Sequence, residues 1–125
     1  MSQFTSLIIF AAVFGNPAGA ASFCDQISGA AIVASDGKFL GTISSKYDAN
    51  SIFNPYGNYG SKYSSDSILN TYSNYGSEYS DISPFNQYAS RPPLLVIDGN
   101  VVAIVTINTN QQGSISPYAI LACQR

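Results

Sequence analysis

The chain contains no histidine and little charge, with five basic and seven acidic residues among its 125. Without histidine, a zinc or copper site has almost no ligands, and a serine nucleophile lacks its usual base. Five basic residues cannot make the positive surface that gathers phosphate groups. The composition therefore argues against a metal site, against most catalytic chemistry and against a nucleic-acid partner, and we expect no cofactor.

Long hydrophobic runs are missing as well. The most apolar segment, Phe4–Phe14, is shorter than the roughly 20 residues that a helix needs to cross a bilayer. It is typical of the central part of a signal peptide, because the helix breakers Gly15–Pro17 and the small residues Ala18–Ala20 follow it. We predict a signal peptide at 1–20 and one secreted or periplasmic domain at 21–125, without a membrane span. The lack of Lys or Arg before the apolar segment favours the alternative, an amino-terminal strand or helix of the core.

Cysteine occurs only twice, as Cys24 and Cys123, at the two ends of the predicted domain. In an oxidising compartment such a pair is expected to form a disulfide, which would place the first and last segments side by side. The alternative is a pair of buried free thiols, as expected if the protein stays in the cytosol.

Two segments carry the pattern of a β-hairpin. Ala30–Ser44 has Asp36-Gly37 between apolar runs, and Leu94–Asn108 has Asp98-Gly99 in the same place. An Asp-Gly pair favours a two-residue type I′ turn, which in the first hairpin would bring Val33 opposite Leu40. In the second hairpin the arm Val101–Ile107 is apolar and β-branched, which predicts a central strand covered on both faces. A last strand is predicted at Tyr118–Cys123.

A 16-residue repeat lies between the hairpins. Copies begin at Ser51 and Ser67, share ten of 16 positions, and are followed by a decayed third copy from Ser83. Gly, Asn and Ser between the tyrosines disfavour a continuous helix, so we expect short helical turns capped by Ser51 and Ser67. The recurring asparagines Asn54, Asn70 and Asn86 are interpreted as turn and cap residues. So few copies cannot fold alone, and we expect them to pack against the sheet.

The tyrosines of the repeat allow two interpretations. Their rings can fill the space between repeat and sheet, or some can be exposed in a row as a stacking platform for a glycan or a partner protein. The residues chosen for such a platform are Tyr56, Tyr59, Tyr72 and Tyr75.

The segment Ser51–Pro93, with its Asn-x-Tyr-Gly-x-Tyr-Gly-Ser-x-Tyr-Ser core, resembles short repeats in uncharacterised exported bacterial proteins. The resemblance covers about a third of the chain. It departs from the pattern in the third copy, where Ala89-Ser90-Arg91 follows Tyr88. It implies an exported bacterial protein and carries no activity with it.

The sequence thus predicts a mostly β domain, a small antiparallel meander or partly closed barrel of about five strands, with the repeat as an irregular layer. The leading hypothesis is a non-catalytic secreted or periplasmic module that binds a glycan or an envelope protein. One alternative is a structural or assembly protein that acts through a sheet edge at Val101–Ile107. A second alternative is a small hydrolase that uses Asp66 with Glu78 or Asp81. The acidic residues hold no fixed phase in the repeat, which argues against a repeated Ca²⁺ site.

Overall fold

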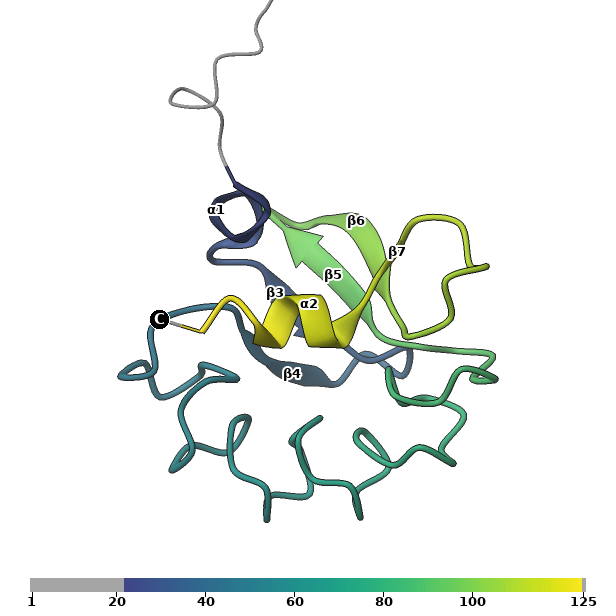
Figure 1. Cartoon of the computed structure of the whole chain (residues 1–125). Coiled ribbons are helices and arrows are strands. Elements are labelled where there is room, and N and C mark those ends of the chain that lie inside the picture. Colours follow the sequence, from purple (N-terminus) through teal and green to yellow (C-terminus); the bar gives the residue numbers. More distant parts are fainter. Residues whose placement is uncertain (1–21, 125) are drawn as a thin grey trace, which may run out of the picture.

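A single five-stranded sheet is the centre of the fold (Figure 1). The computed structural model describes residues 22–124, so the predicted signal peptide lies outside the described residues. The strands lie in the order β4-β3-β5-β6-β7, and two short helices flank them in sequence. The elements are α1 (Phe23–Ile27), β3 (Ala31–Val33), β4 (Phe39–Thr42), β5 (Leu94–Ile97), β6 (Asn100–Val105), β7 (Ser114–Ile115) and α2 (Pro117–Leu121). The fold is therefore mostly β with five strands, as predicted. The sheet is mixed, however, and not wholly antiparallel, and it stays open instead of closing into a barrel.

The hairpin between β5 and β6 has the predicted two-residue turn. Ile97 pairs with Asn100, and the two residues between them have positive φ angles, 52° at Asp98 and 79° at Gly99. Both angles belong to a type I′ turn, whose twist matches that of the strands.

The hairpin between β3 and β4 differs from the prediction. Val33 pairs with Phe39 and not with Leu40, because the connection is longer than two residues. Gly37 has a φ of +90°, whereas Asp36 keeps a negative φ and accepts a hydrogen bond from the Lys38 N–H (2.9 Å). That side-chain bond favours a turn of another type, and the register shifts as a result.

The carboxyl-terminal segment forms a helix where the sequence predicted a strand. Ser116 accepts a hydrogen bond from the Tyr118 N–H (3.1 Å) and so caps α2, with Pro117 in the first helical position. The fifth strand is instead β7, which pairs parallel to β6. Because β7 reaches only Ile104 and Val105, the first half of β6 is paired on one side and exposes the side chains of Val101 and Val102. The predicted covering of this strand on both faces is therefore wrong for its first half.

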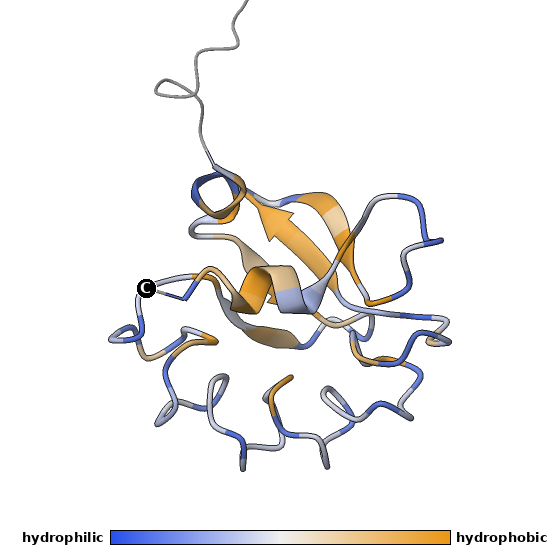
Figure 2. Ribbon diagram, in the orientation of Figure 1, coloured by the Kyte–Doolittle hydropathy of each residue, from blue (hydrophilic) through white to orange (hydrophobic). Residues whose placement is uncertain are grey.

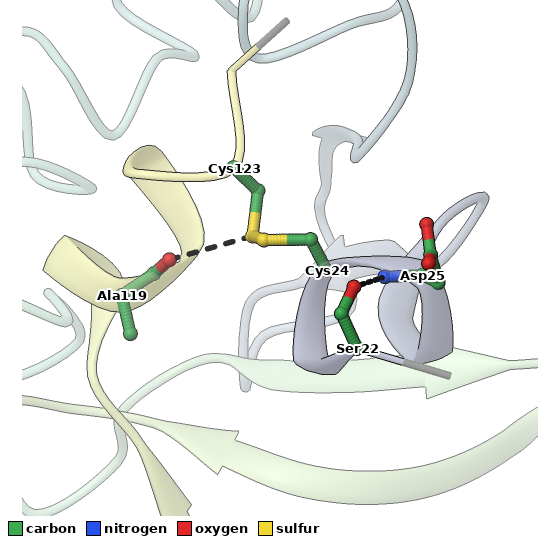
Figure 3. The surroundings of a disulfide bond; sticks show 5 residues. All are labelled: Ser22, Cys24, Asp25, Ala119 and Cys123. Atoms are coloured by element: carbon green, nitrogen blue, oxygen red, sulfur yellow. Dashed lines mark hydrogen bonds between the residues drawn. A yellow bond between two sulfur atoms is a disulfide. The ribbon is translucent and has the colours of Figure 1, made fainter. Parts of the chain in front are cut away.

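The predicted disulfide joins Cys24 in α1 to Cys123 just after α2, with their Cα atoms 5.4 Å apart (Figure 3). It links two segments that are 99 residues apart in the sequence. Ser22 caps α1 through the Asp25 N–H (3.2 Å), and the Cys123 Sγ contacts the Ala119 carbonyl oxygen in α2. The described ends of the chain are therefore held together beside the sheet.

The hydrophobic core gathers residues from the strands, the helices and the repeat. Figure 2 shows apolar residues concentrated in the strands and α2, and polar residues along the outer arc. Side chains with less than 2% exposure include Ile32, Leu40, Leu95, Val105, Ile120, Ile52 and Ile68. Because Ile52 and Ile68 belong to the repeat, the repeat is part of the core, as the sequence predicted.

Candidate binding surface

The repeat folds as an arc of successive turns around the sheet, which we call the turn ribbon (residues 45–90; Figure 1). Backbone N–H groups donate to the carbonyl oxygen three residues earlier, as from Asn70 to Ser67 (3.3 Å) and from Ser73 to Asn70 (3.0 Å). At Ser61 and Ser77 the step is four residues. Four steps of three residues and one step of four make up each 16-residue repeat. The structural unit is therefore a turn of about three residues.

Most turns are closed by the side chain of their first residue. Ser67 Oγ accepts from the Leu69 N–H (3.0 Å), and Asn70 Oδ1 accepts from the Tyr72 N–H (3.0 Å). The same bond, to the residue two positions later, is made at 2.9–3.3 Å by Ser45, Asp48, Ser51, Asn54, Ser61, Ser64, Ser77, Ser80, Ser83 and Asn86. The predicted caps are confirmed, but no helical turns follow them, because a new cap at every third residue competes with helix formation.

The asparagines also join neighbouring turns. Asn70 Nδ2 donates to the Ser64 carbonyl oxygen (3.0 Å), and Asn54 and Asn86 make the equivalent bond six residues back, to Asp48 and Ser80. The amide both accepts and donates, so it satisfies two backbone groups at once, as do the hydroxyls of Ser51 and Ser67. The interpretation of these residues as turn residues therefore agrees with the structure.

The inner side of the turn ribbon is tied to the β3–β4 hairpin by two tyrosines. The Tyr59 ring meets the edge of Phe39, with centroids 5.0 Å apart, and the Tyr75 hydroxyl donates to Asp36 Oδ2 (3.0 Å). Burial, with a further contribution from the bond to Asp36, raises the pKa of Tyr75 above its ordinary value. Both residues were assigned to the predicted platform, and the structure places both, half-buried, against the sheet.

Six other tyrosines point into solvent from the ribbon, with 83–97% of their surface exposed. We call them the outer tyrosines: Tyr47, Tyr56, Tyr63, Tyr72, Tyr79 and Tyr88. Each is two residues beyond a capping Ser or Asn, so their spacing alternates between nine and seven residues. Tyr56 and Tyr72 of the predicted platform are among them. Tyr47, Tyr63, Tyr79 and Tyr88 were missed, although a tyrosine two residues after Ser or Asn is visible in the sequence.

Four outer tyrosines line three neighbouring hollows, which together we call the tyrosine groove. The first hollow, about 410 Å³, lies between Tyr63 and Tyr72, and the second, about 600 Å³, lies between Tyr72 and Tyr79. The third, about 600 Å³, lies between Tyr79 and Tyr88. Successive hollows share the tyrosine that separates them.

The lining of the tyrosine groove combines apolar and hydrogen-bonding side chains. Leu69, Phe85 and Ile107 supply apolar surface, and Phe85 meets the Tyr118 ring of α2 edge-on at 5.3 Å. Polar groups come from Lys62, Asn70, Thr71, Glu78, Asn86 and Gln87. Such a lining suits a ligand that has apolar faces and hydroxyl groups, because most specific pockets pair apolar surface with a few polar contacts.

The three carboxylates considered for hydrolysis have separate partners. Asp66 pairs with Lys38 (3.6 Å), while Asp81 accepts bonds from the Ser90 hydroxyl and N–H and lies 3.6 Å from Arg91. The bonds from Ser90 hold the pKa of Asp81 below its ordinary value. Glu78 accepts a bond from Tyr79, which raises the pKa of that phenol. Within residues 22–124 no three His, Cys, Asp or Glu side chains are placed to hold a metal ion.

No family model, no curated protein and no solved structure matches this chain. In the described part of the chain, no helix has the length and apolar character needed to cross a membrane.

Proposed function

We propose that this protein is a secreted, non-catalytic module that binds an uncharged polysaccharide along the tyrosine groove. The observation that carries the proposal is the succession of three hollows separated by exposed tyrosines, each with polar side chains in its wall. Aromatic rings stack on the apolar faces of sugar rings, while amides, hydroxyls and carboxylates bond to sugar hydroxyls. The groove offers both kinds of contact together.

The repetition of the groove favours a polymer over a single small molecule. Tyr63 and Tyr79 occupy equivalent positions of the 16-residue repeat, as do Tyr72 and Tyr88. A ligand with a repeating unit can occupy several such sites at once, and each added contact then binds within one complex instead of from solution. We therefore expect affinity to rise with the length of the oligosaccharide.

The charge of the groove favours a neutral chain. Lys62 and Glu78 are the ionisable groups other than tyrosine in its lining, and the whole chain has a net charge of −2. A polyanion would meet no cluster of basic side chains, which is the usual source of its affinity. The disulfide agrees with an oxidising location, where extracellular polysaccharides are found.

The test is binding to insoluble cellulose, chitin and β-glucan, followed by calorimetry with soluble oligosaccharides of increasing length. Tyr72→Ala with Tyr79→Ala removes the two outer tyrosines that line the central hollow. This variant should weaken binding about tenfold or more, which corresponds to about 1.4 kcal/mol. The matched control is Tyr47→Ala with Tyr56→Ala, which removes two outer tyrosines that line none of the three hollows and should change affinity less than about twofold.

Two results would overturn the proposal. One is an absence of binding to every polysaccharide, including the case in which a proline-rich peptide binds in their place, since such peptides also dock in aromatic grooves. The other is an equal loss of affinity in the two double variants, which would show that the groove itself is not the site.

A second candidate function is assembly through the free edge of β6. Val101 and Val102 are exposed there, and this half of β6 pairs with β5 but not with β7. An exposed apolar edge can pair with a strand of another chain. Sedimentation over a wide concentration range tests this, and Val102→Lys should return any oligomer to a monomer. A monomer at all concentrations would exclude self-assembly.

A further inference from the structure

The outer tyrosines have the chemical surroundings of reactive phenols. They are 83–97% exposed, although the Lys46 ammonium lies over the Tyr47 ring, 5.4 Å from its centroid. Within residues 22–124 the Tyr79 hydroxyl alone among the six has a hydrogen-bond partner, Glu78. No outer ring in this part of the chain is packed against another aromatic ring. Each phenol except that of Tyr79 is thus open to a large reagent.

The side chains that normally compete with tyrosine for oxidants are missing. The chain has no tryptophan and no histidine, and its one methionine is Met1, in the predicted signal peptide. Both cysteines are joined in the disulfide, so no thiol is free. Thiols and thioethers are the usual first targets of oxidation in proteins. In the described residues, one-electron oxidation therefore falls on tyrosine.

We propose that the outer tyrosines are sites of oxidative coupling, at which a haem peroxidase with hydrogen peroxide joins separate copies of this chain through dityrosine bonds. Each of two phenols loses one hydrogen atom, as an electron and a proton, and hydrogen peroxide is reduced to two water molecules. The two phenoxyl radicals form a carbon–carbon bond between ring positions next to the oxygens. The hydrogens at those positions then move to the oxygens, and both rings become aromatic again.

The arrangement of the outer tyrosines favours coupling between chains over coupling within one. They are seven or nine residues apart along the turn ribbon, which forms an arc around the sheet (Figure 1), and in the described part of the chain no outer ring packs on another. A chain with one reactive site can form only dimers, whereas a chain with six can form a branched network. The product should therefore be a series of covalent oligomers that ends in insoluble material.

The inner tyrosines provide an internal comparison. The ring of Tyr59 is packed on Phe39 and the hydroxyl of Tyr75 is held by Asp36, so both should couple slowly. Among the outer tyrosines, Tyr79 should contribute the smallest share, because its bond to Glu78 keeps the phenol protonated to higher pH.

The test treats the disulfide-bonded protein with a haem peroxidase and hydrogen peroxide. Dityrosine is measured by its fluorescence, oligomers are resolved on a reducing denaturing gel, and mass spectrometry identifies the joined peptides. One variant replaces all six outer tyrosines by phenylalanine: Tyr47→Phe, Tyr56→Phe, Tyr63→Phe, Tyr72→Phe, Tyr79→Phe and Tyr88→Phe. Its matched control replaces the inner pair, Tyr59→Phe with Tyr75→Phe. Thermal unfolding checks that both variants fold.

The unmodified protein and the inner-pair control should give the same series of oligomers. The six-site variant should lose most of the dityrosine and form no oligomer larger than a dimer through Tyr118, which is 64% exposed. Equal coupling in the six-site variant, joined peptides that contain chiefly Tyr59 and Tyr75, or a product that stays monomeric would each overturn the proposal. So would an absence of dityrosine in acid hydrolysates of the material from which the native protein is isolated.

This inference does not depend on the proposed polysaccharide binding, and a further variant separates the two. Tyr47→Phe with Tyr56→Phe changes two outer tyrosines that line none of the three hollows, and it removes two hydroxyls that coupling needs. This variant should therefore retain polysaccharide binding while its yield of dityrosine falls. Loss of polysaccharide binding by the alanine variants has no bearing on dityrosine formation.

Discussion

At the scale of single residues, the turn ribbon depends on small and short polar side chains at fixed places. Ser, Asn and Asp close the turns because their oxygens reach the N–H group two residues on. Glycine at two equivalent positions has a different role. Gly60 and Gly76 have no positive φ angle and are required because the chain passes close to itself.

The first prediction concerns these two glycines. A Cβ at Gly76 would lie 2.2 Å from the Asn70 carbonyl oxygen, and one at Gly60 would lie 2.1 Å from that of Asn54. Because backbone cannot move aside easily, Gly76→Ala and Gly60→Ala should each lower the free energy of unfolding by about 3 kcal/mol. Urea denaturation measures the change.

The control is Gly37→Ala, where nothing lies within 4 Å of the new Cβ but φ is +90°. Only backbone strain of about 1–2 kcal/mol is expected there. If Gly76→Ala costs no more than Gly37→Ala, the close approach does not limit the ribbon.

The second prediction concerns Tyr75 and alkaline pH. Its pKa is raised in the folded protein by burial and by Asp36, so the folded state favours the neutral phenol. The resulting stabilisation is complete below the ordinary pKa of about 10 and is lost as the pH rises through the folded-state value. The difference in unfolding free energy between the unmodified protein and Tyr75→Phe should therefore be constant near neutral pH and shrink above about pH 10. Urea titrations at several pH values measure it.

Tyr56→Phe controls for the loss of a surface phenol, since Tyr56 is 97% exposed. A difference for Tyr75→Phe that stays constant up to pH 11 would contradict the assignment of this bond as a stabilising contact of the neutral phenol.

At the scale of elements, the turn ribbon is a connection of fixed length between β4 and β5. Near its start it is attached to β4, where the Ile52 N–H donates to the Thr42 carbonyl oxygen (2.9 Å). Near its end the Pro84 carbonyl oxygen accepts from the Ile107 N–H, beyond β6 (3.0 Å). Between these attachments it contributes Ile68 to the core. The number of turns therefore has to match the distance around the sheet.

The third prediction follows from this fixed length. Deletion of one repeat, residues 67–82, removes Ile68 from the core and shortens the turn ribbon, so the protein should lose cooperative unfolding. Near-ultraviolet circular dichroism and urea denaturation measure the loss. Replacement of residues 67–82 by a second copy of residues 51–66 keeps the same number of turns and should fold. The prediction is wrong if the deletion variant unfolds cooperatively with a free energy of unfolding within about 1 kcal/mol of that of the intact protein. The length of the turn ribbon would then not matter for folding.

The elements also show how far the sequence could predict the structure. Asp98-Gly99 and Asp36-Gly37 look alike, but only the first forms a type I′ turn, because the bond that the Lys38 N–H donates to the Asp36 side chain favours another geometry. The segment after Ser116 is apolar enough for a strand, yet Ser116 and Pro117 are the cap and first residue of a helix. The sequence therefore contains a helix-start signal, but the apolar residues after it also fit a strand.

The candidate site was predictable in part for a similar reason. The 16-residue repeat can be recognised because the same residues recur at equivalent positions. The turn of about three residues cannot be recognised in this way, because Ser, Asn and Asp alternate in the same capping role. With the larger period alone, Tyr56 and Tyr59 look equivalent. The shorter period separates them, because Tyr56 follows a cap by two residues and projects outward, while Tyr59 faces the sheet.

At the scale of the whole molecule, a small sheet and the long turn ribbon both lie within one loop that the disulfide closes. The described strands contain two to six residues each, so the sheet alone buries a modest core. The disulfide closes a loop of 99 residues that contains nearly all of the described chain. Its effect is to limit the freedom of the unfolded state.

The fourth prediction gives the size of this effect. Cys24→Ala with Cys123→Ala should lower the free energy of unfolding by about 4 to 5 kcal/mol in the chain-entropy model. A reducing agent should lower the urea midpoint of the unmodified protein and leave that of the double variant unchanged. A loss of less than about 1 kcal/mol would mean that the link restricts the unfolded chain little.

Capping side chains and outer side chains have separate roles in the turn ribbon, and this affects how its surface can change during evolution. Capping residues are bound to the backbone and tolerate few replacements, whereas the outer side chains contact almost nothing else in the fold. Exchanging an outer side chain should alter stability by no more than about 0.5 kcal/mol. Natural selection or a protein engineer can therefore replace the outer side chains of the turn ribbon one by one, with almost no change in the free energy of unfolding.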